Sequence, residues 1–313
     1  MQIFNDFQSV PLAYHNCAVS IGKFDGVHCG HVRIINRLKR HADKLSVPSI
    51  IVTFCPHPAA VLRSDSGICP IQTLERKIEI IRQFNIDAII IINPSKQFLQ
   101  QSAESFFFGV LCDQLHARVI VCGENFTFGH DRTGTPESIK RYGQSAGTEI
   151  DIVDSVQIDG ATVSSSIIRK LLKEGQINEA NKFLGSPYQI TGVVATGDAR
   201  GRTLGFPTAN LEQIETIIPK HGIYATITTI NEKQFASTTN IGTSPTFNQN
   251  SPRVEIFIHN FEGNLYGKKL NVDLIQKIRE IKKFNSKEEL IIQMKNDIKQ
   301  SEKICKEHIL ERR

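Results

Sequence analysis

The chain has 313 residues, of which 40% are hydrophobic and 22% charged, and its formal net charge is +5. This length exceeds what one hydrophobic core usually serves, so we expect two domains in an ordinary soluble globular protein. The mild positive charge suits an enzyme that handles anionic nucleotides, and it falls short of the basic surface of a dedicated nucleic-acid binder.

The seven cysteines are scattered, odd in number and free of any CxxC pair. A disulfide framework or a cysteine zinc site is therefore not expected, and the pattern favours a reducing cytoplasm. The N-terminus lacks a basic start followed by an apolar run, so no signal peptide is expected. The longest apolar stretch, Ala88–Ile92, is too short to span a bilayer. We expect no membrane partner, and the sequence predicts no particular oligomeric state.

Short apolar runs alternate with helix-period stretches in the first half of the chain. Runs that read as buried strands, rich in Ile and Val and bounded by turn formers, lie at 17–22, 49–54, 86–92 and 118–122. Helices are expected at 31–45, 73–84, 103–115 and 136–146, and two shorter ones at 164–173 and 177–184. This alternation predicts an α/β, Rossmann-like domain with a parallel sheet covered on both faces and ligands at the carboxyl ends of its strands.

The pattern changes near Gly185, after which the helical period disappears. Short alternating segments separated by Gly, Pro and Asn turns lie at 188–195, 223–230, 237–241, 254–259 and 269–275. They predict a small antiparallel β-barrel. A final helix is expected from Ser286 to about Leu310, with Ser286 and Glu289 forming a capping box. We therefore predict an α/β domain over 1–185 and a β domain over 186–313.

The segment Gly22–His31, GKFDGVHCGH, follows a predicted strand and opens a predicted helix. Its glycines permit tight turns and close approach of a polyphosphate, and the helix N-terminus offers free N–H groups. His28 and His31 are three residues apart and share one face, so they can donate hydrogen bonds to the α- and β-phosphates of ATP. The residues expected to bind phosphate here are Gly22, Phe24, Asp25, Gly26 and Gly30. The alternative is that the histidines cap the helix or bind a structural metal.

A serine-rich segment, Val163–Arg169, precedes another predicted helix. Ser164, Ser165 and Ser166 could cap that helix and do nothing more. Arg169 lies one turn further along and could bind a phosphate bidentately.

The segment 197–210, GDARGRTLGFPTAN, suggests a loop that folds over phosphates, with Gly201 and Arg202 in the phosphate-binding part. Thr208 and Asn210 offer neutral oxygens suited to Mg²⁺, although Pro-Thr-x-Asn also makes an ordinary turn. In the predicted strand that follows, alternation places Glu255 on the face opposite Val254 and Ile256. Glu255 is a candidate general base for phosphoryl transfer, and the alternative is an exposed strand glutamate.

The first-half motifs resemble those of the bacterial bifunctional riboflavin kinase/FMN adenylyltransferase (FAD synthetase) family. The resemblance rests on GKFDGVHCGH, TFCPHP (53–58), GENFTFG (123–129) and VSSSIIR (163–169). It implies a HIGH-type nucleotidyltransferase in which His28 and His31 contact the ATP phosphates, Asn125 assists phosphate or metal positioning, and the serines with Arg169 close the site. Cys55 stands where the family commonly has an acidic residue, and Ser166 replaces the usual Thr. His57 could be functional or could stiffen its loop.

The second half is similar to the riboflavin kinase half of the same family. The matching segments are GDARGRTLGFPTAN, GIY (222–224), NIGTSPTF (240–247), VE (254–255) and NLYG (264–267), followed by Arg279 to Phe284. The resemblance implies that Thr208 and Asn210 hold Mg²⁺–ATP, that Glu255 is the general base and that Arg279 belongs to the flavin-side loop. Phe257 and Asn264 stand where the family often has His and Asp.

These expectations define a bifunctional enzyme that phosphorylates riboflavin to FMN and then adenylylates FMN to FAD, with Mg²⁺ in both steps. One alternative is a single-activity enzyme in which Cys55, Phe257 or Asn264 has silenced one half. Another is a flavin- or RNA-binding regulator, suggested by the basic residues of the final helix. Acidic residues interleaved along that helix favour a solvated, mixed-charge face instead.

Overall fold

The computed structural model describes residues 1–62, 69–196, 205–243 and 252–311. The chain divides into two compact units. One comprises residues 1–68 and 74–164, and the other 69–73 and 165–313. Over the described residues, no helix combines the length and the apolar character needed to cross a membrane.

The first unit is built on a six-stranded parallel sheet in the order β1-β4-β3-β2-β5-β6. Its strands are β1 (Gln2–Phe4), β2 (Ala18–Ile21), β3 (Ser49–Phe54), β4 (Ala88–Ile92), β5 (Val119–Gly123) and β6 (Glu149–Val153). The four predicted strands are confirmed as the central ones. The two edge strands were not predicted, because β1 is only three residues long and β6 is mostly polar or half-buried.

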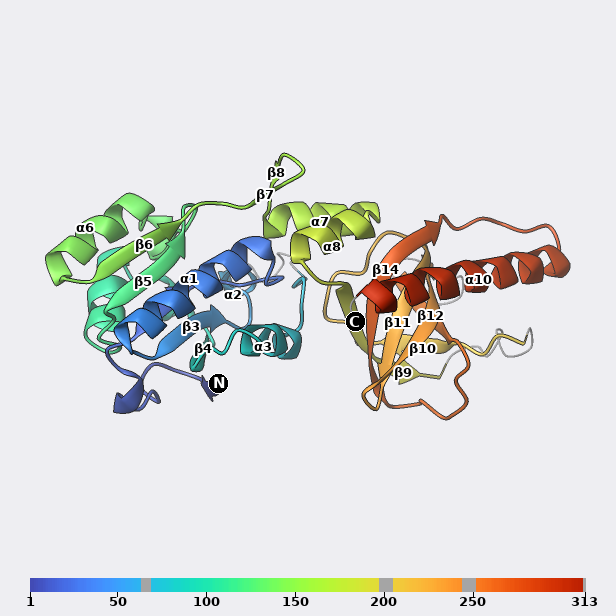
Figure 1. The fold of residues 1–313 in the computed structure, drawn as a ribbon, viewed down its shortest axis with the longest axis horizontal. Coiled ribbons are helices and arrows are strands. Elements are labelled where there is room, and N and C mark those ends of the chain that lie inside the picture. Colours follow the sequence, from blue (N-terminus) through green and yellow to red (C-terminus); the bar gives the residue numbers. More distant parts are fainter. Residues whose placement is uncertain (63–68, 197–204, 244–251, 312–313) are drawn as a thin grey trace. The chain divides into compact units, whose positions relative to one another are not determined.

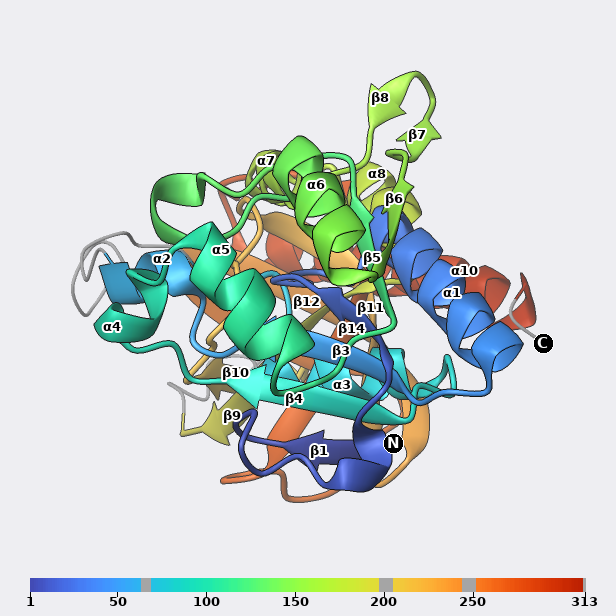
Figure 2. The ribbon, with the colours of Figure 1, turned by 90° about the vertical axis from the view of Figure 1, so that its left-hand side faces the viewer.

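Helices cover both faces of this sheet (Figure 2). The main ones are α1 (Cys29–Leu45), α3 (Leu74–Arg82), α5 (Ala103–Ser105), which continues into a π-helical turn (Phe106–Cys112), and α6 (Pro136–Ala146). Two shorter helices are α2 (Pro58–Leu62) and α4 (Lys96–Leu99), and a small hairpin pairs β7 (Gln157–Ile158) with β8 (Ala161–Thr162). One core lies beneath α1 and α3, and the other beneath the α5 segment and α6. The Rossmann-like architecture is therefore confirmed.

The chain order of the strands creates a switch point beside β2. From β2 the chain moves outward through β3 to β4, whereas β5 lies on the other side of β2 and leads to β6. At such a point the connections leave the two neighbouring strands in opposite directions, which opens a crevice at their carboxyl ends. The loop that opens α1 and the turn that follows β5 both lie there, so the topology places Gly22–His31 where an open α/β sheet binds ligands.

The second unit contains a closed antiparallel barrel in the order β10-β13-β12-β11-β14-β9. Its strands are β9 (Tyr188–Ala195), β10 (Ala209–Glu212), β11 (Gly222–Ile230), β12 (Lys233–Thr243), β13 (Pro252–Ile258) and β14 (Lys269–Arg279). The predicted barrel is confirmed, with β12 and β14 longer than expected. The strand β10 was missed because only Leu211 of its four residues is buried.

Two helices pack on the barrel, α8 (Ile177–Leu184) and α10 (Lys287–Glu311), and α7 (Ser165–Glu174) packs against α8. Asn181 of α8 donates from Nδ2 to the Leu274 carbonyl and accepts from the Tyr188 amide, which joins α8 to β14 and β9. The long helix α10 lies along β11, β12 and β14 (Figure 1). At its start the Ser286 hydroxyl accepts from the Glu289 amide at 3.1 Å, while the Glu289 carboxylate accepts from the Asn285 amide rather than from Ser286.

The compact units divide near Ser164, and α7 and α8 belong with the barrel. A division of packing does not by itself show where two activities divide. The boundary at residue 185 therefore stays a prediction.

Candidate functional site

The loop between β2 and α1 holds three residues with positive φ within four positions. Phe24, Gly26 and Val27 have φ angles of 45°, 95° and 35°. Positive φ is strained for a side chain that carries a Cβ, and such residues cluster at functional sites. Phe24 and Val27 are 1% exposed, so burial of their side chains offsets that strain. The buried Phe24 and Val27 side chains therefore help to fix the conformation of the loop.

His28 and His31 meet at the first turn of α1. His28 is the N-cap residue, and its Nδ1 accepts a hydrogen bond from the His31 amide at 3.3 Å. The two rings stack with centroids 3.7 Å apart and planes 17° apart. A Cβ at Gly30 would lie 3.1 Å from the His28 ring, so glycine at this position leaves room for the stack. The Nδ1 atom of His28 therefore caps the helix, as the capping alternative expects. The other ring nitrogens of His28 and His31 do not take part in this cap.

Burial controls the charge of both imidazoles. His28 is 6% exposed, and desolvation lowers its pKa to about 4 although Asp25 acts in the opposite direction. Burial also lowers the pKa of His31 well below its ordinary value, and the neighbouring His28 and Lys77 add to that effect. Both rings are therefore neutral near pH 7. Within the described part of the chain, the buried Nδ1 of His31 has no hydrogen-bond partner.

The other residues predicted in this loop support the histidines. The Phe24 ring lies 5.2 Å from the His31 ring, and a Cβ at Gly22 would lie 3.1 Å from the Phe24 ring. Asp25 is 5% exposed and electrostatically coupled to His28. Phosphate contact by Gly22, Phe24, Asp25, Gly26 and Gly30 stays a prediction, and what the structure gives them is a common role in shaping the loop.

Ser164 and Asn125 are the predicted partners of the histidines that lie in the first unit. Ser164 directly follows Val163, which lies close to the start of α1. The carbonyl oxygen of Val163 lies 3.9 Å from the Cβ position of Gly30. Asn125 is exposed in the turn after β5, and β5 is the strand next to β2. The topology brings the turn after β5 and the loop after β2 to the same edge of the sheet.

Ser165, Ser166 and Arg169 lie in the first two turns of α7, in the second unit. Arg169 donates from Nη1 to the Ser165 carbonyl at 3.5 Å. His57, in the first unit, accepts from the Ala59 amide at Nδ1, which favours the loop-stiffening interpretation for that nitrogen.

A second polar cluster lies on the barrel, with Glu255 of β13 at its centre. Alternation along β13 is as predicted: Val254 and Ile256 are fully buried, and Glu255 is half-buried on the opposite face. In the barrel Glu255 is paired with Asn210 of β10 on one side and Asn240 of β12 on the other. The Asn240 Nδ2 donates to Glu255 Oε2 at 3.2 Å.

Arg253, two residues before Glu255 on the same face, joins Glu255 to Asn210. Its Nε donates to Asn210 Oδ1 at 3.0 Å and lies 3.4 Å from Glu255 Oε1. Thr208, half-buried, immediately precedes β10. The structure thus brings Glu255 and Asn210 together and adds Asn240 and Arg253. Gly201 and Arg202 lie outside the described residues.

Arg279 was predicted on the flavin side. At the end of β14 its guanidinium binds both carboxylate oxygens of Asp297, from Nε at 2.9 Å and from Nη2 at 2.7 Å. Nη1 donates to the Glu280 carbonyl, and the guanidinium carbon lies 5.8 Å from the centre of the Phe284 ring. Arg279 therefore fastens the end of the barrel to α10, and its flavin contact stays a prediction.

Three polar residues beside these sites were not predicted: Lys77, Asn240 and Arg253. Asn240 and Arg253 were recognisable only through strand register, because the sequence does not show which residue of a neighbouring strand faces Glu255. Lys77 did carry a signal. Spacing from Ile80 and Ile81 places it on the buried stripe of α3, where a lysine is out of place.

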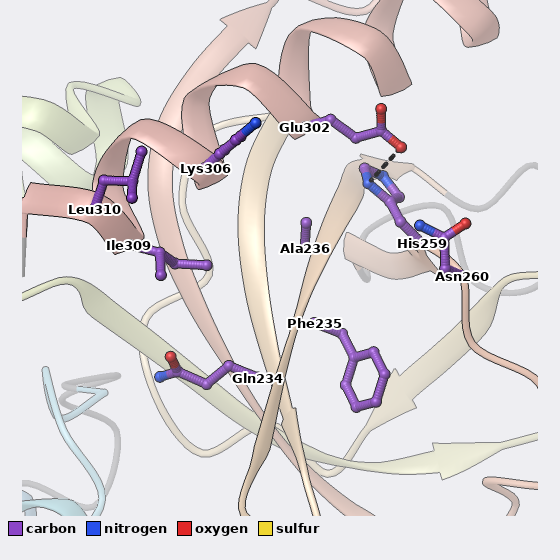
Figure 3. Close-up of a pocket in the computed structure, with 9 residues that line it drawn as sticks. All are labelled: Gln234, Phe235, Ala236, His259, Asn260, Glu302, Lys306, Ile309 and Leu310. Carbon is purple, nitrogen blue, oxygen red and sulfur yellow. Dashed lines mark ion pairs between the residues drawn. The ribbon is translucent and has the colours of Figure 1, made fainter. Parts of the chain in front are cut away.

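A pocket of about 580 Å³ lies between β12 and α10 (Figure 3). It is lined by Gln234, Phe235, Ala236, His259, Asn260, Glu302, Lys306, Ile309 and Leu310. None of the predicted site residues is among them. The described residues also contain no cluster of three His, Cys, Asp or Glu side chains that could hold a metal ion.

Comparison with known proteins matches each half of the chain to a separate enzyme family. The FAD synthetase family model matches residues 11–167, and the riboflavin kinase family model matches residues 184–305. Among solved structures, a chain described as a macrolide-efflux protein from Streptococcus pneumoniae superimposes with a TM-score of 0.87 at 29% identity, covering 96% of this chain and 98% of its own.

Curated relatives match over nearly the full length. The bifunctional riboflavin kinase/FMN adenylyltransferase of Buchnera aphidicola (subspecies Schizaphis graminum) is 33% identical over 95% of this chain and 97% of its own length. Enzymes with the same description from Haemophilus influenzae and Escherichia coli are each 30% identical and cover 95% and 90% of this chain, and 97% and 90% of their own lengths. The chain therefore belongs to the family of bifunctional riboflavin kinase/FMN adenylyltransferases, the enzymes that its motifs predicted.

Proposed function

We propose that the chain makes FAD from riboflavin in two ATP-dependent steps, one carried by each unit. The barrel transfers the γ-phosphate of ATP to riboflavin, and the parallel-sheet unit transfers AMP from a second ATP to the FMN formed. The observation that carries this proposal is the presence of two separate polar sites, each inside the region matched by the corresponding family model.

In the adenylyl-transfer site, preorganised donors do the work. FMN phosphate attacks the α-phosphorus of ATP and pyrophosphate leaves, so no covalent enzyme intermediate is needed and positioning supplies most of the rate. His28 and His31 are neutral and stacked, and each can donate one N–H to a phosphate oxygen. The free N–H groups at the start of α1 add to this donor set. Charge must then come from other residues.

The serine-rich segment and Asn125 complete this site in our proposal. Ser164, Ser165 and Ser166 supply hydroxyl donors, and Arg169 supplies a bidentate cation for the triphosphate. Asn125 supplies an amide from the turn after β5, across the switch point. The family resemblance supports these roles.

In the kinase site, Glu255 acts as general base. Its carboxylate accepts the proton of the ribityl hydroxyl as that oxygen attacks the γ-phosphorus, and ADP departs. Asn240 and Arg253 contact different oxygens of the carboxylate, which fixes its orientation on a rigid strand. The second strand neighbour, Asn210, ties this base to the proposed metal position.

The oxygens of Thr208 and Asn210 suit Mg²⁺, and the carboxylate of Glu255 lies beside them. The Asn210 Oδ1 accepts a hydrogen bond from the Arg253 Nε, and its second lone pair can bind a metal ion. Neutral oxygens beside a carboxylate are a donor set that fits magnesium. When bound, the ion would neutralise charge on the triphosphate. Gly201 and Arg202 are proposed to bind phosphate, and Arg279 to order the flavin-side loop. All seven cysteines are free thiols, which supports a cytoplasmic location.

Product analysis tests the proposal. Purified protein with riboflavin, ATP and Mg²⁺ is expected to accumulate FMN first and FAD later, with ADP from the first step and pyrophosphate from the second. Formation of FMN without FAD, even when FMN and ATP are supplied directly, would reduce the chain to a single-activity kinase. Flavin binding without either product would favour the regulator alternative.

A further inference from the structure

Lys77 is a buried lysine that the proposed chemistry has not used. It lies on α3, is 7% exposed, and shares the buried stripe of that helix with Ile80 and Ile81. Lysine is almost never fully buried unless its ammonium is paired, because removing the charge from water is costly. Burial lowers the pKa of Lys77, in line with that cost. Because burial of the Lys77 ammonium is costly, we expect contacts that compensate it and a function that requires it.

The contacts of Lys77 lead directly to the phosphate loop. Its Nζ donates to the Lys23 carbonyl at 2.8 Å and to the Thr53 hydroxyl at 3.2 Å. The Thr53 hydroxyl in turn donates to the same Lys23 carbonyl at 3.0 Å. The ammonium therefore joins α3, the end of β3 and the second residue of the Gly22–His31 loop. Both hydrogen-bond acceptors are neutral, so they solvate the charge without neutralising it.

The Lys77 ammonium also interacts electrostatically with two titratable groups of the Gly22–His31 loop. The Asp25 carboxylate is the main group that opposes the lowering of the Lys77 pKa. Lys77, in turn, contributes to the lowering of the His31 pKa. The ammonium therefore interacts electrostatically with both the Asp25 carboxylate and the His31 ring, all within the first unit.

The histidine pair creates a need for such a charge. Because His28 and His31 are neutral near pH 7, they offer N–H groups but no net positive charge. The pyrophosphate leaving group gains negative charge as the α-phosphorus is attacked, and a fixed cation in a water-poor site stabilises that charge strongly. Lys77 is such a cation, and its position is fixed by the loop that carries the histidines.

We propose that Lys77 is a positioning residue for adenylyl transfer, whose ammonium holds the Gly22–His31 loop and provides the positive charge that the neutral histidines lack. This inference rests on the adenylyl transfer proposed for the first unit. It adds a residue from α3, outside every motif by which the site was recognised.

The test compares Lys77→Met, which removes the ammonium and keeps an unbranched side chain of nearly the same length, with Lys77→Arg, which keeps the charge. Lys39→Met serves as the matched control, because Lys39 is a partly buried lysine of the same unit whose ammonium pairs with Asp43 on α1. For each variant, kcat and the KM for ATP are measured for FAD formation from FMN. FMN formation from riboflavin is measured on the same preparation.

For Lys77→Met we expect kcat of FAD formation to fall about 100-fold or more, as for the loss of one transition-state donor, with FMN formation unchanged. Lys77→Arg should recover at least tenfold of that loss, and Lys39→Met should behave as the wild type. A kcat within threefold of wild type for Lys77→Met overturns the proposal, as does an Arg variant no better than the Met variant.

Thr53→Val separates the charge from the contact if Lys77→Met fails to fold. It removes the hydroxyl that links Lys77 and Lys23 while the cation stays, and we expect FAD formation to fall by no more than tenfold. A loss as large as 100-fold would assign Lys77 a merely structural role and overturn the proposal. If the wild type itself formed no FAD from FMN, the proposed function would fail, whereas FAD formation by Lys77→Met within threefold of an active wild type would defeat the Lys77 proposal alone.

Discussion

The two proposed phosphate-transfer sites differ in their burial, in the elements that carry them and in the chemical groups that they present. The proposed adenylyl-transfer site is buried, lies on a loop with positive φ angles at a helix N-terminus and presents neutral donors. The proposed kinase site lies on neighbouring strands of a barrel and presents a half-buried carboxylate between two asparagines. The difference follows the chemistry. An FMN phosphate is already an anionic nucleophile and needs only positioning, whereas a riboflavin hydroxyl must lose a proton to a base.

The largest expected effect comes from removing both histidines. His28→Ala/His31→Ala should lower FAD formation from FMN by about 1,000-fold or more, because two preorganised donors are lost together. FMN formation from riboflavin should be unaffected, since the kinase residues belong to the other unit. Separate assays of the two half-reactions measure this, and a parallel loss of both activities would show that the sites are not separable.

Replacing the proposed base gives the reciprocal result. Glu255→Gln keeps the size and the hydrogen-bonding capacity of the side chain but cannot accept the proton. We expect kcat for FMN formation to fall by roughly 100- to 10,000-fold, with FAD formation from added FMN preserved. An unchanged rate of FMN formation in a folded variant would remove Glu255 from the role of base.

The buried histidines also make the stability of the first unit depend on pH. The pKa of His28 is about 4 in the folded chain against an ordinary 6.5, so the unfolded chain binds its proton first as the pH falls. Stability is therefore complete above pH 6.5 and is lost progressively between pH 6.5 and about 4, by about 3 kcal/mol at full effect for His28 alone. Denaturant titrations across this range measure it. The double alanine variant should show a flatter pH dependence, and an equally steep one would contradict this origin.

A smaller effect is expected from Arg253, which holds the kinase residues together. Arg253→Met removes the hydrogen bond to Asn210 and the cation beside Glu255, so kcat for FMN formation should fall about tenfold. Lys233→Met, an exposed lysine of β12, is the control and should have no effect. If Arg253→Met were as active as this control, Arg253 would be a bystander at the barrel surface.

More of the first candidate site than of the second could be predicted from the sequence, and the reason is physical. Local chemistry is visible in one segment, so the Gly22–His31 loop, its histidines and the buried runs of the central strands were predictable. Strand register is not local. Asn240 faces Glu255 only because β12 pairs with β13 in one register, and nothing in either segment specifies it.

Lys77 marks the same limit for the first site. Its helix was predicted, but the partners that give the ammonium its place come from a loop 54 residues earlier and from β3. Short strands such as β1, at the edge of the parallel sheet, and β10, in the barrel, were not predicted because they bury too few side chains to form a pattern. Elements with a repeating buried face are readable from sequence, whereas elements held by their neighbours are not.

The central claim is that one chain carries two independent catalytic sites, and that the product of the kinase site is the substrate of the adenylyl-transfer site. The most direct test mixes His28→Ala/His31→Ala with Glu255→Gln and supplies riboflavin, ATP and Mg²⁺. We predict that the first variant alone stops at FMN, that the second alone forms neither FMN nor FAD, and that the mixture forms FAD from FMN released into solution. A mixture that forms no FAD, although each variant keeps its remaining half-reaction, would contradict the account.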